Sequence, residues 1–192
     1  MYHKGLSRQI IIDQAIEIIQ EEGEENFSLH ILASRLGVKT ASLYTHIHNL
    51  EDVLNEVGLY SIALQKEYEM KYIGDLKGAQ AIKALAKGYY EFAINNRSLY
   101  KINMNVIHSS DVLMIQGRSL KEPIEKALAD FELSQDEVIQ WQRILRCIMH
   151  GYIDQQDLGF FNMYKADKEE AYNMAIQCFI DGLNTYIQNK KG

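Results

Sequence analysis

Proline, the residue that most effectively stops a helix, occurs once in this chain of 192 residues, at Pro123. A proline inside a helix removes a backbone hydrogen bond and clashes with the preceding turn. With one exception, therefore, helix can propagate through the sequence. The chain is also rich in good helix formers and has few alternating apolar and polar runs of the kind that strands require. We predict an all-α fold.

Composition excludes several classes of protein. Hydrophobic residues make up 47% of the chain and charged residues 24%, which is typical of a globular protein. No apolar run approaches the roughly 18 residues that span a bilayer, and the N-terminus lacks the apolar core of a signal peptide. We expect a cytoplasmic protein without a membrane partner. Cys147 and Cys178 lack the spacing of a disulfide framework or zinc site, and we expect both in the core.

The spacing of apolar residues predicts a series of helices. Gly23 should end the first helix, Ser28 should cap the second, and Asn49 with Asp52 should start the fourth in the manner of a capping box. Ser134 is a further cap, ahead of a long C-terminal helix. The predicted helices cover residues 8–22, 28–36 and 40–47, a fourth beginning at 49, and then 77–95, 97–107, 112–130, 135–161 and 168–189.

Charge is distributed unevenly along the chain. The formal net charge is −6, which argues against a nucleic-acid partner because neutralised phosphates supply most of the affinity for DNA. Between Asn26 and Asn49, however, the sequence contains Arg35, Lys39 and three histidines but neither aspartate nor glutamate. An acidic chain with such an acid-free window is compatible with DNA binding at that window.

The acid-free window contains a helix-turn-helix pattern. Ser28–Leu36 forms a short bracing helix, Gly37–Lys39 a tight turn, and Thr40–His46 the helix that would enter the major groove. Gly37 supplies the positive φ that the turn needs, and Val38 fills the space between the helices.

The residues of this window resemble the signature of the tetracycline-repressor (TetR) family. The matching positions run from Leu32-Ala33 through Leu36-Gly37-Val38, Ala41-Ser42-Leu43-Tyr44, His46-Ile47 and Asn49 to Leu54, and the resemblance spans about residues 8–58. It implies a helix-turn-helix DNA-binding domain over 1–58, with its motif at 28–48. It also implies a larger helical domain for ligand binding and dimerisation over 59–192.

The family's chemistry can be transferred to matching positions. The resemblance implies that Tyr44 and His46 contact phosphates, that Thr40 and Ser42 point hydroxyls at base edges or phosphates, and that Ala41 allows close approach. The full set of expected DNA-binding residues is Arg8, Ser28, Lys39, Thr40, Ala41, Ser42, Tyr44, His46 and Asn49.

The chain departs from the family pattern at two positions. Leu50 replaces a lysine that commonly bonds phosphate, and Glu51 and Asp52 follow it. We expect one phosphate contact to be lost there. Lys39 stands where a serine or threonine usually caps the reading helix, and we expect Thr40 to cap instead.

The C-terminal part resembles a TetR subgroup with a tryptophan, a histidine and a glycine on one late helix, here Trp141, His150 and Gly151. The resemblance implies a two-fold dimer built from the last two helices. The expected interface residues are Gly151, Tyr152, Ile176, Phe179, Ile180, Leu183 and Tyr186. Aromatic and soft side chains predict an apolar ligand pocket lined by Tyr89, Phe92, Met104, Ile107, Met114, Met149 and Phe160.

Two functions from different classes fit these patterns. The favoured one is a dimeric transcriptional repressor that binds a pseudo-palindromic double-stranded DNA operator and is released by a small apolar or amphipathic effector. The alternative is a helical small-molecule- or metal-binding protein or enzyme with a vestigial DNA-binding domain, because Cys147, His150, Asp154 and Asp157 lie near one helix face. A single helix rarely closes a metal site, so we expect no metal, no cofactor and no enzymatic activity.

Overall fold

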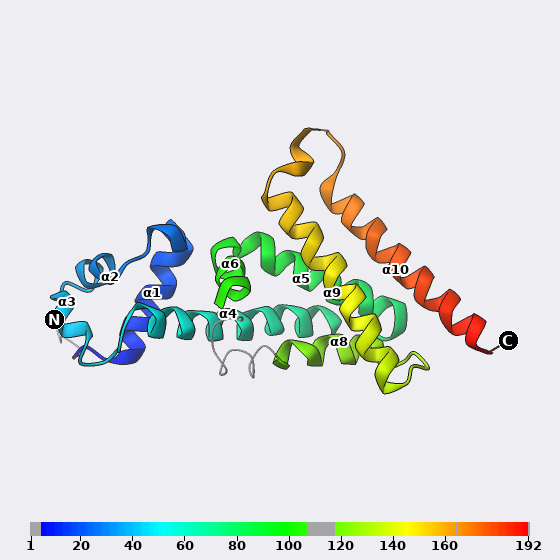
Figure 1. Ribbon diagram of the computed structural model, residues 1–192, viewed down its shortest axis with the longest axis horizontal. Coiled ribbons are helices and arrows are strands. Elements are labelled where there is room, and N and C mark those ends of the chain that lie inside the picture. Colours follow the sequence, from blue (N-terminus) through cyan, green and yellow to red (C-terminus); the bar gives the residue numbers. More distant parts are fainter. Residues whose placement is uncertain (1–4, 107–117, 164, 192) are drawn as a thin grey trace. The chain divides into compact units, whose positions relative to one another are not determined.

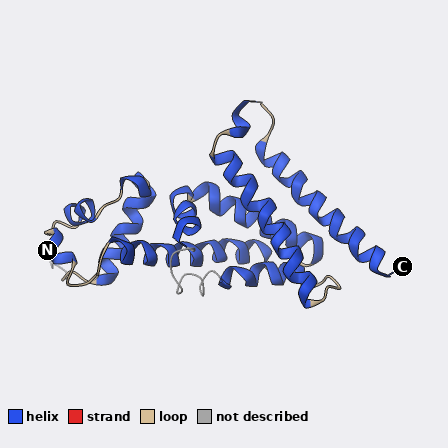
Figure 2. Cartoon of the chain, viewed as in Figure 1, coloured by secondary structure: helices blue, strands red, loops and turns tan. Residues whose placement is uncertain are grey.

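The computed structural model describes residues 5–106, 118–163 and 165–191, and within these ranges all regular structure is helical (Figure 2). The predicted all-α fold is confirmed. Figure 1 labels the helices. Their bounds are α1 Arg8–Glu22, α2 Leu29–Arg35, α3 Thr40–Leu43, α4 Leu50–Ile73, α5 Gly78–Asn95, α6 Arg97–Val106, α8 Lys121–Leu128, α9 Gln135–Asp157 and α10 Lys168–Lys191, with 3₁₀ turns η1 Glu24–Asn26, η2 Arg118–Leu120 and η3 Phe160–Met163.

The chain divides into two compact units. The first lies within residues 1–64 and 94–119, and the second within 65–93 and 120–192. Helix α4 therefore begins in the first unit and ends in the second, whereas α5 belongs to the second unit almost to its end. The domain boundary predicted at residues 58 and 59 stays a prediction.

In the first unit, the first three helices and the start of α4 enclose a small aliphatic core. The predicted caps form as expected: the Ser28 hydroxyl accepts a hydrogen bond from the backbone N–H of Ile31, and Gly23 and Gly37 have positive φ values of 87° and 66°. These ends limit α2 to two turns. The buried apolar residues include Ile11, Ile12, Ala15, Ile18, Ile19, Phe27, Leu32, Ala33, Leu43, Ile47, Val53 and Val57.

In the second unit, α9 and α10 pack antiparallel. The Trp141 ring lies 5.3 Å from that of Phe179 and 5.6 Å from that of Tyr186, and Tyr152 lies 5.3 Å from Tyr172. The start of α9 carries the predicted cap as a full capping box between Ser134 and Glu137. The buried stripe includes Ala81, Ile82, Leu85, Tyr89 and Phe92 of α5, Leu145, Met149 and Ile153 of α9, and Tyr172, Ile176, Phe179, Ile180 and Leu183 of α10.

Some local predictions were wrong. Cys147 and Cys178 are both exposed and do not belong to the core. Lys39 is the N-cap residue of α3 and no side chain caps that helix, so Thr40 does not replace the missing cap. The helix expected over 135–161 ends at Asp157, and residues 112–117 of the helix expected over 112–130 lie outside the described residues.

No helix among the described residues is long and apolar enough to cross a membrane.

Candidate nucleic-acid interface

The short helix α3 presents one face to the core and the other to solvent. Leu43 is fully buried and Ile47 is 2% exposed, whereas Ala41 and Ser42 are exposed and Tyr44 is 55% exposed. Leu43 and Ile47 lie one helical turn apart, and the His46 and Ile47 backbone N–H groups both donate to the Leu43 carbonyl. Because Leu43 already fills the core position, the Tyr44 ring is left at the surface.

The turn between α2 and α3 sets the direction of α3. Gly37 donates its backbone N–H to the carbonyl of Ser34, and Val38 donates to the carbonyl of Ala33. Gly37 adopts the left-handed conformation that side chains with a Cβ rarely take. The tight turn therefore places α3 as a separate, outward-facing helix after α2, as the sequence predicted.

The structure assigns different surroundings to the predicted DNA-binding residues. Lys39, Ala41, Ser42, Tyr44 and Asn49 are exposed, and Arg8, Ser28, Thr40 and His46 are half-buried. Two of the set already serve as helix caps: Ser28 accepts from Ile31, and the Asn49 side-chain oxygen accepts from the backbone N–H of Asp52 at 2.8 Å. The exposed cluster around α3 is therefore Lys39, Ala41, Ser42 and Tyr44.

Arg8 is bound within the first unit. Its guanidinium donates to both carboxylate oxygens of Asp52, at 2.9 and 2.6 Å, to a carboxylate oxygen of Glu56 at 2.8 Å, and to the backbone carbonyl of His46 at 3.1 Å. The hydrogen bond from Arg8 holds the pKa of Asp52 at about 2. Sequence reasoning missed this pairing because 44 residues separate Arg8 from Asp52.

Arg35, the arginine of the acid-free window, is also paired with acids. Its guanidinium donates to Glu21 at 3.0 Å and to Glu22 at 2.5 Å, both at the end of α1. These hydrogen bonds raise the pKa of Arg35 further above its ordinary value. Arg35 therefore adds less positive charge to the surface than the local sequence suggests.

The expected pocket residues do not form one group. Tyr89, Phe92 and Met149 are buried in the second unit, whereas Phe160 is 64% exposed in η3. Met104 belongs to the first unit, and Ile107 and Met114 lie outside the described residues. These seven residues stay a prediction as a set, and Phe160 does not share the buried position of the first three.

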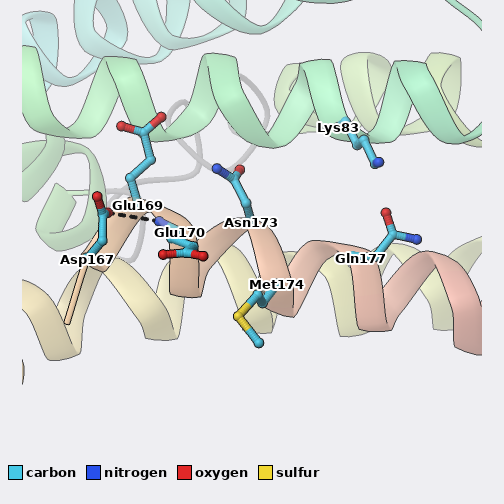
Figure 3. Close-up of a pocket in the computed structure, with 7 residues that line it drawn as sticks. All are labelled: Lys83, Asp167, Glu169, Glu170, Asn173, Met174 and Gln177. Carbon is cyan, nitrogen blue, oxygen red and sulfur yellow. Dashed lines mark hydrogen bonds between the residues drawn. The ribbon is translucent and has the colours of Figure 1, made fainter.

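A cleft of about 530 Å³ lies between α5 and the start of α10, and none of the expected pocket residues lines it (Figure 3). Most of its lining residues are polar or charged: Asp167 caps α10 by accepting from the backbone N–H of Glu170 at 3.0 Å, and Glu169 is paired with Lys87. The lining residues are Lys83, Asp167, Glu169, Glu170, Asn173, Met174 and Gln177.

A cluster of polar groups is buried in the second unit. Glu69 is 2% exposed, and one of its carboxylate oxygens accepts from the Gln65 side chain at 2.8 Å. Burial raises the pKa of Glu69 to about 7 and that of Tyr172 well above its ordinary value. The Tyr172 hydroxyl donates to the Ala86 carbonyl at 3.0 Å.

The α9 face that carries Cys147, His150, Asp154 and Asp157 makes contacts within the protein. His150 Nδ1 lies 3.2 Å from the Tyr89 hydroxyl, and His150 Nε2 lies 3.3 Å from a carboxylate oxygen of Asp154. Among the described residues, no group of three or more His, Cys, Asp or Glu side chains is arranged to hold a metal ion.

The expected dimer residues fall into two classes. Ile176, Phe179, Ile180 and Leu183 are at most 4% exposed within the single chain, so they form the core of the second unit and are not available to a partner. Of the remaining three, Gly151 and Tyr186 are exposed and Tyr152 is half-buried. The prediction was wrong for the four buried residues because an apolar helical stripe does not reveal which neighbour covers it.

Another face of the helix pair carries exposed apolar and small residues. They lie one or two positions before buried residues of each helix, and their spacings of i, i+3, i+7 in α9 and i, i+4, i+8 in α10 keep each set on one face of its helix. No atom lies within 4 Å of where a Cβ would stand on Gly151 or Gly182. This outward face consists of Ile144, Cys147 and Gly151 of α9 and Met174, Cys178 and Gly182 of α10.

Residues 82–179, just over half of the chain, match the family model described as the tetracyclin repressor-like C-terminal domain. The chain belongs to the TetR family of transcriptional regulators. The helix-turn-helix of the first unit is thus the DNA-binding module of a TetR-family regulator, and the second unit contains most of its family-specific domain.

Several relatives resemble this TetR-family chain. The uncharacterised HTH-type transcriptional regulator YobS of Bacillus subtilis is 26% identical over 97% of this chain and 96% of its own length. The class D tetracycline repressor protein of Escherichia coli is 29% identical over 70 residues, which cover 36% of this chain and 32% of that protein.

Solved structures share the fold of this regulator at low identity. A protein from Rhodococcus sp. RHA1 has a TM-score of 0.79 at 18% identity, covering 94% of this chain and 97% of that one. ActR of Streptomyces coelicolor, solved in complex with actinorhodin, has a TM-score of 0.67 at 16% identity, covering 95% and 98%. These likenesses confirm the TetR fold.

Proposed function

We propose that this TetR-family regulator is a homodimeric repressor that binds a pseudo-palindromic operator through α3 and is released by a small apolar or amphipathic molecule. The observation that carries the proposal is the exposed cluster of Lys39, Ala41, Ser42 and Tyr44 on a helix whose opposite face is fixed in the core. In a dimer, two such helices would lie about one DNA turn apart, roughly 34–36 Å.

The side chains around α3 suit different parts of a DNA duplex. We infer that Thr40 and Ser42 read base edges with their hydroxyls, while Ala41 allows close approach. Tyr44 and His46 would hold phosphates, and Lys39 would add charge at the start of the helix. Ser28 and Asn49 would contribute mainly by capping α2 and α4, because their side-chain oxygens already accept backbone hydrogen bonds.

The experiment that tests DNA reading is selection of bound fragments from random duplexes, followed by footprinting. Ser42→Ala should alter base preference and cost up to about tenfold in operator affinity. Tyr44→Ala should weaken binding to all sequences alike. Gln20→Ala, an exposed change on α1, is the matched control and should bind as the wild type does. Full affinity and unchanged selectivity in both α3 variants would refute this reading surface.

We infer that a second copy of the chain covers the outward face of α9 and α10. Support comes from the six exposed apolar or small residues on one side of the helix pair and from the open space beside Gly151 and Gly182, which permits close helix approach. Sedimentation should find a dimer for the wild type and for Asn184→Arg, which lies outside this face. Gly182→Arg should be monomeric with its helix content retained, and a dimeric Gly182→Arg would contradict the assignment.

We propose that the effector binds within the second unit, where Tyr89, Phe92 and Met149 supply buried aromatic and soft apolar surface. A ligand can release the operator only if it binds the DNA-free conformation more tightly than the DNA-bound one. Compounds that raise the melting temperature of the full chain should therefore also lower its operator affinity. Compounds that raise the melting temperature and leave DNA binding unchanged in every case would contradict the repressor mechanism.

A further inference from the structure

We propose that Arg8 is a positioning residue that locks the reading helix in place, and that it is not a phosphate contact. This inference rests on the proposed DNA-reading function of α3. Arg8 at the start of α1 joins the His46 carbonyl, just after α3, to Asp52 and Glu56 in the first two turns of α4. We call Arg8, Asp52, Glu56 and the His46 carbonyl the Arg8 latch.

The latch fixes the short segment that connects α3 to α4. Besides binding Arg8, the Asp52 carboxylate accepts from the backbone N–H of His48 at 2.9 Å, and the Asp52 backbone N–H donates to the Asn49 side chain. Residues 46–49 are thereby attached to α1 and α4 at three points. Since α3 contains a single helical turn, its orientation depends on these attachments more than on its own hydrogen bonds.

The geometry leaves Arg8 little capacity for DNA. A guanidinium has five N–H donors, of which four belong to its two terminal nitrogens. In the latch each terminal nitrogen donates twice: Nη1 to His46 and Asp52, and Nη2 to Asp52 and Glu56. A phosphate contact through the end of Arg8 would break hydrogen bonds to two carboxylates, and the side chain is only 39% exposed.

The latch also explains the acidic start of α4, which is unexpected next to DNA. Asp52 would repel a phosphate if it were unpaired, yet its side chain is 19% exposed and paired bidentately with Arg8. Asp52 is therefore required for DNA binding despite its negative charge. A phosphate-contact role for Arg8 makes the opposite prediction, because removing a nearby negative charge would then strengthen binding.

The test measures operator affinity against salt concentration for Arg8→Met, Asp52→Asn, their double variant and Arg8→Lys in the full-length protein. We expect each single change to lower affinity by about tenfold, the double variant to be no weaker than either single one, and the salt slope to stay unchanged. Arg8→Lys should also lose affinity, because lysine keeps the charge but lacks the bidentate fork. Glu51→Gln, the same charge change at an exposed neighbouring position, is the control and should not weaken binding.

Other outcomes would overturn the latch. Tighter binding by Asp52→Asn, or a salt slope reduced by about 1.8 in Arg8→Met (about 0.9 for each protomer of the dimer), would identify Arg8 as a phosphate contact. Amide exchange of residues 46–49 without DNA should be faster in Arg8→Met and Asp52→Asn than in Glu51→Gln, and unchanged exchange would refute the positioning role. If the wild type selected no operator while exchange rose as expected, the DNA-reading function would fail and the role of the latch in DNA binding would fail with it.

Discussion

Replacing Glu69 with glutamine should change how the stability of the second unit depends on pH. The Glu69 side chain lies on α4, is 2% exposed and accepts one hydrogen bond from Gln65, while its second carboxylate oxygen is buried without a partner. Removal from water raises the pKa of this carboxyl from 4.5 to about 7, although the Gln65 hydrogen bond and the charge of Arg146 act in the opposite direction. Between pH 4.5 and about 7, the Glu69 carboxyl is therefore protonated in the folded chain and ionised in the unfolded chain.

The size of the effect follows from this difference in pKa. Between 4.5 and about 7, each pH unit is worth about 1.4 kcal/mol, so the free energy of unfolding of the wild type should fall by about 3 kcal/mol across that range. Above pH 7 the carboxyl is charged in both states and this dependence ends. Glutamine does not titrate, although its amide nitrogen would be buried without a partner at every pH. The informative quantity is therefore how the difference in unfolding free energy between Glu69→Gln and the wild type changes with pH.

Urea unfolding from pH 5 to pH 8, followed by fluorescence of the single tryptophan, measures this trend. Trp141 packs between α9 and α10 and so reports on the second unit. The stability of Glu69→Gln relative to wild type should rise with pH, while Glu67→Gln, an exposed change two residues earlier, should follow the wild type. Protein concentration must be fixed because a dimer is stabilised by mass action. A difference between variant and wild type that stays constant within about 0.5 kcal/mol would refute the reasoning.

Three further predictions concern packing, capping and charge. Gly88→Ala should lower the unfolding free energy by about 1–3 kcal/mol, since its Cβ would stand 2.9 Å from backbone atoms of Tyr68 and Glu69, and unchanged urea unfolding would contradict this. Ser134→Ala should cost about 1 kcal/mol in the same assay, whereas Ser134→Asp should retain most of the cap of α9. The logarithm of the operator binding constant should fall with the logarithm of the salt concentration with a shallow slope of about −2 to −4, because one or two phosphates are neutralised per protomer. A slope near −10 would contradict this prediction.

The features that sequence reasoning predicted well depend on residues close together in the chain. The caps at Ser28 and Ser134 and the positive φ of Gly37 are each determined within four residues. The positions of the helices followed from the same local patterns. The Arg8 pairing with Asp52 spans 44 residues and the Arg35 pairing with Glu21 spans 14, and no local pattern specifies either contact.

The misassigned face of α10 has a different cause. The spacing of Ile176, Phe179 and Leu183 correctly identified an apolar stripe. Hydrophobic periodicity shows which face of a helix is buried, but it does not show which helix or partner covers that face. In this chain α9 packs against that part of α10, where the Trp141 ring contacts Phe179. The outward face carries Cys178 and Gly182, whose small side chains produce little hydrophobic signal, so a surface of this kind emerges only when the core is known.

Ion pairs near the DNA-binding module lower the positive charge that it can present to phosphates, in a chain whose net charge is already −6. Glu21 and Glu22 bind Arg35, and Asp52 and Glu56 bind Arg8, so two arginines that would otherwise attract any phosphate are held in internal ion pairs. We therefore expect weak sequence-independent attraction to DNA, while Ala41 and Ser42 of α3, which we propose to face the bases, are exposed and uncharged. If the arginines stabilise the frame of the reading helix as proposed, discrimination between DNA sequences should depend more on base contacts than on total charge.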